Sequence, residues 1–142
     1  MAKSKIRPIA ICLFRQGDRI LVHEGYDSQK VEAFCRPLGG GIDFGETSQA
    51  AIAREIQEEL GAEISDIRLL GILESIFEYR GDRLHEIVFV YDARFVDAAW
   101  YQKPVLQVQE GKRQFEARWR SLDQLRGDNP RLVPEQLWTL LQ

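Results

Sequence analysis

The sequence predicts a single α/β domain in which helices cover both faces of a sheet. Three observations lead to this prediction. The chain has 142 residues and 44% apolar content, runs rich in apolar and β-branched residues recur along its length, and one helical pattern interrupts those runs. This size is typical of one domain with one core. Because no repeat, linker or low-complexity segment breaks the pattern, we expect one domain over residues 1–142.

The first strands are expected at residues 9–14 and 20–22, where apolar runs flank the polar turn 16–18. This arrangement is typical of a β-hairpin whose first strand is buried on both faces. Residues 25–45 contain five glycines and Pro37, so a long loop is expected there. Long ordered loops often carry function.

A central helix is expected to begin at a cap at Thr47 or Ser48 and to run to about Leu60. Gly61 can then supply the left-handed residue that stops a helix. The apolar stripe recurs at every fourth position: Ile52, Ile56 and Leu60. This spacing places the stripe on one face of the helix, which can pack on a sheet.

The remaining elements follow from the same signals. They are expected in this order: strands at 67–79 and 86–96 with a turn between them, shorter strands at 105–108 and 116–120, a capped helical turn at 121–125, and a closing helix with Pro134 at its first position.

Composition excludes several classes of partner. The 19 basic and 22 acidic residues give a net charge of -3, so nucleic acid is an unfavoured partner. Cys12 and Cys35 match no zinc-site spacing, which favours a reduced, cytoplasmic chain. No stretch approaches the roughly 20 apolar residues that cross a bilayer, so no membrane partner is expected.

Three acids crowd one patch of the central helix. Glu55 and Glu59 lie one turn apart, and Glu58 lies three positions after Glu55. Arg54 can pair with Glu58 at spacing four, but Glu55 and Glu59 have no basic residue three or four positions away, so both are expected to lack a local partner. A solvated acidic face remains an alternative, because like charges at this spacing cost only about 0.2–0.5 kcal/mol.

The loop before the helix turns this patch into a motif. Gly40, five residues, Glu46, seven residues and then residues 54–62 resemble the Nudix box. The matching fixed positions are Gly40, Glu46, Arg54, Glu55, Ile56, Glu58, Glu59 and Gly61. Ala62 departs from the larger aliphatic residue usual in the family, which we interpret as a packing variation. Because residues 119–122 and the strand order also resemble the family, the expected fold is the Nudix α/β/α sandwich, with a mixed sheet between helices.

The resemblance implies a metal-dependent hydrolase that cleaves a diphosphate bond in a nucleoside diphosphate linked to another moiety, by attack of a metal-activated water on phosphorus. The expected cofactor is Mg²⁺, with Mn²⁺ as a substitute, because Mg²⁺ prefers carboxylate oxygen and bridges acids to phosphates. The implied metal ligands are Glu55, Glu58, Glu59 and the carbonyl of Gly39. The residues implied to hold the loop and orient these acids are Gly40, Glu46 and Arg54.

The general base is expected either in the box or on a later loop. Glu110 and Glu116 are the later candidates. Glu110 is favoured because it precedes a glycine in a polar segment, whereas Glu116 can make a structural ion pair. The pair His85-Glu86 could touch substrate, although a satisfied strand-end pair is the favoured interpretation. Four aromatic residues could stack a base or belong to the core: Tyr26, Phe34, Phe77 and Tyr79.

Other functions stay open at this stage. A Nudix-like nucleotide sensor without turnover predicts damaged box acids, and none is damaged. A plain α/β domain predicts no specific metal affinity, and an RNA-directed pyrophosphatase requires a basic groove that the sequence does not show. The substrate is expected to be a small nucleotide, but its identity, the residues that bind it and the formation of a homodimer are undetermined by these residues.

Overall fold

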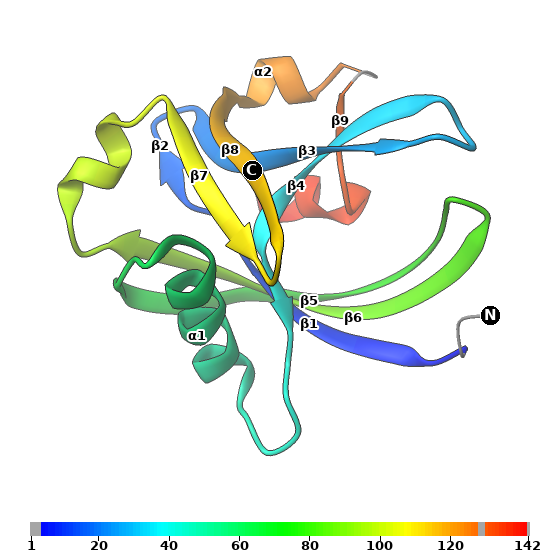
Figure 1. The fold of residues 1–142 in the computed structure, drawn as a ribbon, viewed down its shortest axis with the longest axis horizontal. Helices are drawn as coiled ribbons and strands as arrows, with labels where there is room; N and C mark the ends of the chain where they lie inside the picture. The colour runs from blue at the N-terminus through cyan, green and yellow to red at the C-terminus, as the bar shows by residue number, and fades with distance from the viewer. Residues whose placement is uncertain (1–3, 128–129, 142) are drawn as a thin grey trace.

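The protein, described by a computed structural model over residues 4–127 and 130–141, is built around one mixed sheet (Figure 1). Its long strands are β1 Ile6–Cys12, β3 Arg19–Asp27, β4 Glu32–Gly41, β5 Ile64–Tyr79, β6 Asp82–Phe95, β7 Val105–Glu110 and β8 Arg113–Ser121. They lie in the order β5-β6-β1-β4-β3-β8-β7. Two short strands join this sheet: β2 Arg15–Gln16 pairs with β3, and β9 Arg131–Leu132 pairs with β4.

Helices cover both faces of the sheet. Helix α1, Ser48–Leu60, packs on one face through Ala51, Ile52 and Ile56. The short helix α2, Leu122–Leu125, and the 3-10 helix η2, Glu135–Leu140, contribute Leu125 and Leu137 to a second core on the other face. A further 3-10 helix, η1, spans Ala98–Gln102 and leads into β7. The predicted mixed sheet between helices is therefore confirmed.

The first strand is central, and its predicted hairpin with residues 20–22 holds only at its last residue, where the N–H of Leu21 donates to the carbonyl of Phe14 at 3.2 Å. Strand β1 pairs in parallel with β6 and antiparallel with β4, while the hairpin forms between β2 and β3. Residues 9–14 are all buried, as predicted. A strand that is apolar on both faces buries most surface in the middle of a sheet. This explains why β1 pairs with the distant strands β4 and β6 and not with β2 or β3.

The predicted loop over residues 25–45 is also wrong, because strands β3 and β4 occupy most of it. Gly25 lies opposite Phe34, and a Cβ at Gly25 would overlap the Phe34 ring. The glycine therefore belongs to the strand and makes room for an aromatic ring. The actual turn is short, because the Asp27 carboxylate accepts hydrogen bonds from the N–H groups of Gln29 at 2.9 Å and Lys30 at 3.3 Å.

Asp27 also reaches the next hairpin. Its second carboxylate oxygen accepts a hydrogen bond from the N–H of Arg80 at 3.3 Å, which ties the β3–β4 turn to the β5–β6 turn. The side chain is almost fully buried. Burial raises its pKa, but the three N–H donors outweigh burial, so the pKa of Asp27 lies below its ordinary value.

The helix predictions hold where local signals are strong. Thr47 caps α1, with its hydroxyl accepting from the N–H of Ala50 at 3.1 Å, and Gly61 ends the helix with a φ of 71°. Ser121 and Gln124 form a reciprocal capping box at α2. The closing helix is a 3-10 helix that Pro134 precedes and does not join. Among the described helices, none is long and apolar enough to cross a membrane.

Candidate active site

Helix α1 presents the three predicted acids beside the end of β4. Ile52 and Ile56 are fully buried and fix the rotation of the helix on the sheet. This rotation places Glu59 in the interior, where the residue is 4% exposed. Glu55 is half-buried with 15% of its side chain exposed, and Glu58 is mostly exposed at 59%. The three acids therefore form a gradient from interior to solvent.

The glycines at the end of β4 let the strand pass directly against these acids. A Cβ built on Gly40 would lie 2.5 Å from the carboxyl carbon of Glu55 and 2.6 Å from both of its oxygens. Gly39 has a φ of 155°, and a Cβ there would overlap the carbonyl of Ala10 on β1. Only residues without side chains fit between β1 and the helix acids.

Glu59 is a buried acid whose carboxylate is only partly satisfied by the described residues. Its Oε1 atom has no hydrogen-bond partner among the described residues. Burial is the main cause that raises the pKa of Glu59 to about 9, and the charges of Glu55, Glu110 and Glu58 raise it further, against a smaller lowering by the N–H of Gly39. A buried carboxylate of this kind destabilises the fold unless it binds a cation or a proton.

Arg54 connects the loop to the helix acids. Its guanidinium forms a fork with Glu46, with Nε 2.7 Å from one carboxylate oxygen and Nη2 2.9 Å from the other. Nη2 also donates to the carbonyl of Gly41 at 3.0 Å, and Nη1 lies 3.3 Å from Glu58. The hydrogen bonds from Arg54 lower the pKa of Glu46 to about 2. Arg54 and Glu46 thus tie the loop before the helix to the helix itself.

The expectation that Glu55 lacks a local partner is wrong. Arg54 Nη1 lies 3.1 Å from Glu55 Oε1, although the two residues are adjacent in sequence. Rules for helix pairs consider spacings of three and four, but here the fork to Glu46 folds the long Arg54 side chain back along the helix. Burial still outweighs this pairing, and the pKa of Glu55 is raised.

The donor types fit a divalent cation of the Mg²⁺ kind. Glu55 and Glu59 offer carboxylate oxygens, among them the unpartnered Oε1 of Glu59, and Mg²⁺ prefers hard oxygen ligands of this kind. Within residues 4–127 and 130–141, no three His, Cys, Asp or Glu side chains already converge into a metal cage, and Glu58 is turned toward Arg54. Glu55 and Glu59 are therefore the acids that could hold such a cation, while Glu58 pairs with Arg54.

Of the two later candidates for a base, only Glu110 lies near the box. It ends β7, which packs against α1, and its charge raises the pKa of both Glu55 and Glu59. Its one hydrogen bond to a described residue comes from Arg113 at 3.3 Å. Glu116 instead accepts from Arg118 at 2.8 Å on β8, which is the structural pairing that the sequence allows for it.

The structure also brings together His23, Arg113 and Phe115, three residues that the sequence analysis did not select. Arg113 lies over the ring of Phe115 at 5.5 Å, and that ring lies 4.9 Å from the ring of His23. His23 pairs in register with Arg36 on β4. Burial, then Arg36 and Arg113, lower the pKa of His23 to about 4. Arg36 lies within residues 25–45, which were expected to be a loop, so its pairing with His23 on β3 could not be predicted.

The adjacent residues His85 and Glu86 are each satisfied, but by different partners. Glu86 is buried and accepts from Arg36 Nη2 at 2.8 Å, whereas His85 Nε2 lies 3.0 Å from Glu74. Among the aromatic candidates, Phe34 and Tyr79 meet edge to face with ring centroids 5.8 Å apart, and Tyr26 is exposed. Cys12 and Cys35 are free and buried, and burial raises the pKa of Cys35 to about 11.

The fold and this constellation match known proteins. The family model described as NUDIX domain matches residues 5–139. The chain belongs to the Nudix hydrolase family. It is 32% identical over 108 residues to the NAD-capped RNA hydrolase NudC of Mycobacterium tuberculosis and of Mycobacterium bovis, an alignment that covers 70% of this chain and 34% of either relative. This Nudix chain thus spans about a third of the length of those curated relatives.

Solved structures share the Nudix fold of this chain. A MutT NUDIX hydrolase from Burkholderia pseudomallei superposes with a TM-score of 0.64 at 22% identity, covering 97% of both chains. A NUDIX hydrolase from Nitrosomonas europaea also gives a TM-score of 0.64, at 18% identity over 96% of this chain and 86% of the other. The predicted Nudix sandwich is confirmed.

Proposed function

We propose that this Nudix hydrolase cleaves a diphosphate bond in a nucleoside diphosphate linked to a further group, with Mg²⁺ as its cofactor and Mn²⁺ as a substitute. The observation that supports this most is Glu59, a buried carboxylate with an unpartnered oxygen beside two further acids and the glycines that end β4. Such an arrangement is costly without a cation. A domain with merely solvated acids would leave all three exposed.

The proposed ligands are Glu55, Glu58, Glu59 and the carbonyl of Gly39. When bound, Mg²⁺ would offset charge on the diphosphate and lower the pKa of a water. Arg54 holds the Gly41 carbonyl, the Glu46 carboxylate and Glu55 in one network, so its role is to position the acids. In this proposal Glu110 accepts the proton of the attacking water at a carboxylate oxygen, because it is exposed and lies beside the box.

The substrate class is proposed from the relatives and from charge. NudC is named an NAD-capped RNA hydrolase, and a further structural relative is named a UDP-X diphosphatase. The second name describes a nucleoside diphosphate that carries a further group. The net charge of -3 favours a small molecule over RNA for this chain. Arg113, which adjoins both Glu110 and Phe115, is the proposed contact for a phosphate oxygen.

A hydrolysis screen tests the proposal. The substrates are NADH, ADP-ribose, nucleotide sugars, dinucleoside polyphosphates and nucleoside triphosphates, each with Mg²⁺, with Mn²⁺ and with chelator. We expect release of a nucleotide from one class, abolished by chelator. Glu59→Gln should reduce turnover by about 10³-fold or more, since it removes a metal ligand, while the exposed Glu63→Gln serves as the matched control. Nucleotide binding without any turnover would support a sensor instead.

A further inference from the structure

The sheet extends beyond the reach of helix α1. Figure 1 shows the N-terminal part of β1 and the hairpin of β5 and β6 running away from α1. Three large aliphatic side chains on β1 and β5 are more than half exposed, Ile6 at 58%, Ile72 at 55% and Ile76 at 53%. Exposed apolar side chains are ordinary when they are scattered, but a contiguous group of them marks an interaction site.

Strand register places these three side chains on one face of the sheet. Residues that lie directly opposite one another on neighbouring strands point to the same side, and so do residues two positions apart on one strand. Three adjacent rows across β1, β6 and β5 are thereby defined: Ile6-His85-Ile76, Pro8-Ile87-Glu74 and Ala10-Phe89-Ile72. Ala10 and Phe89 pack in the same core as α1. The other two rows therefore continue the α1 side of the sheet past the helix, and we call this surface the β1–β6–β5 face.

The polar groups inside this face satisfy each other. His85 and Glu74 are the two ionisable residues in the three rows, and His85 Nε2 lies 3.0 Å from Glu74 Oε2. The other side chains of the rows are aliphatic or aromatic, and Pro8 is exposed like its isoleucine neighbours. The face can therefore be covered without separating a charged group from its partner.

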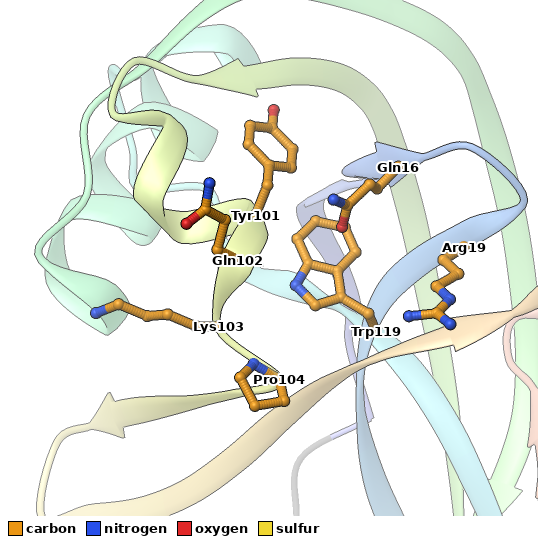
Figure 2. Close-up of a pocket in the computed structure, with 7 residues that line it drawn as sticks. All are labelled: Gln16, Arg19, Tyr101, Gln102, Lys103, Pro104 and Trp119. Carbon is orange, nitrogen blue, oxygen red and sulfur yellow. The ribbon is translucent and has the colours of Figure 1, made fainter.

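The hollows of the chain lie elsewhere. One of about 430 Å³ is lined by residues of β2, β3, the segment from η1 to β7, and β8 (Figure 2), and one of about 260 Å³ is lined by residues of β3 and β8. None of the nine residues in the three rows lines either hollow. Small-molecule binding in these hollows thus gives no reason for the exposed isoleucines, whereas an apolar sheet face is a surface that packs on another sheet.

The charges at the rim indicate which partner fits. The next row of the same face sets Arg83 on β6 opposite Glu78 on β5, and both residues are exposed. A partner that is strongly acidic or strongly basic would bring a like charge close to one of them. A second copy of this chain offers both signs, because a two-fold axis makes one surface its own partner.

We propose that the β1–β6–β5 face binds a second copy of this chain, so that two sheets pack face to face across a two-fold axis. Ile6, Ile72 and Ile76 of both copies are then buried in one apolar layer. At the rim, the Arg83 guanidinium of each copy pairs with the Glu78 carboxylate of the other. This proposal concerns assembly and does not rest on the proposed hydrolysis.

The test is sedimentation equilibrium of the full chain from low micromolar concentrations to about 0.1 mM. We expect a dimer that dissociates on dilution. Ile76→Glu should weaken dimerisation by about 100-fold or more, because the two-fold axis places two added carboxylates in one apolar layer. Val96→Glu is the matched control, since Val96 is also 55% exposed but follows the far end of β6, and it should dimerise like the wild type.

Two further measurements make the result decisive. Ile76→Ser, with its fold checked by thermal unfolding, should weaken dimerisation by about tenfold through lost apolar burial alone. In a mixture of copies with isotope-labelled isoleucine methyl groups and unlabelled copies, NMR contacts between copies should come from Ile6, Ile72 and Ile76.

Several outcomes would overturn the proposal. A folded chain that stays monomeric at the highest concentration would do so, as would a dimer that both Ile76 variants leave intact. Contacts between copies that come from other parts of the chain would assign the interface to another surface. Species that keep growing beyond two copies would exclude a closed two-fold pair.

Discussion

Gly40→Ala tests the packing of β4 against the helix acids most directly. The added Cβ would lie 2.5 Å from the Glu55 carboxyl carbon, about 1 Å closer than an ordinary carbon contact of roughly 3.5 Å. The strand cannot retreat, because Gly39 already lies against the carbonyl of Ala10. Glu55 must therefore move by about 1 Å, and a displacement of that size at a catalytic centre can cost about 10²-fold in rate.

The assay measures kcat/KM with the substrate found in the screen, together with thermal unfolding. Gly41→Ala is the matched control, because a Cβ at Gly41 meets nothing within 4 Å. It should keep its activity and gain up to about 1 kcal/mol of stability from the unfolded chain. Wild-type kcat/KM in a folded Gly40→Ala protein would refute the argument that Glu55 acts from its present position.

Further predictions concern the surrounding groups. Arg54→Lys should lower kcat/KM by about tenfold or more, because an ammonium cannot reproduce the fork to Glu46; unchanged kinetics would contradict the positioning role. The pKa of His23 is about 4 in the folded chain and roughly 6.5 when unfolded, so the unfolded chain takes up the proton first. The free energy of unfolding, measured by urea titration, should fall by up to about 3 kcal/mol as the pH drops from about 6.5 to about 4. His23→Gln should make this pH dependence weaker. Cys12 and Cys35 are buried with raised pKa values, so a thiol reagent should modify neither before the chain unfolds. Mass spectrometry of the labelled chain counts the modified cysteines.

The parts of the fold that the sequence predicts well are those with local signals. Helix α1 has a capping threonine, an apolar stripe and a terminal glycine, all within 15 residues of one another. The box acids lie on the same helix. Their motif spacing is local too, so the sequence can place them together on this helix.

The errors concern contacts between distant residues. Gly25 resembles a loop residue until Phe34 is known to lie across from it. The place of β1 between β4 and β6 depends on strands that begin about 20 and 70 residues later. Likewise, His23 and Arg36 become neighbours only through strand register, so no spacing rule along the chain could have selected them.

The Asp27 carboxylate has a consequence for the order of folding. Its bond to the N–H of Arg80 joins residues 53 positions apart, and it links two hairpins that β1 separates in the sheet. Closing so long a segment costs entropy that only the completed sheet can offset. Each hairpin can form alone, but their tips can meet only after β1 has inserted between them. This contact is therefore expected to be among the last to form, and its protection in hydrogen exchange would report the completed native sheet.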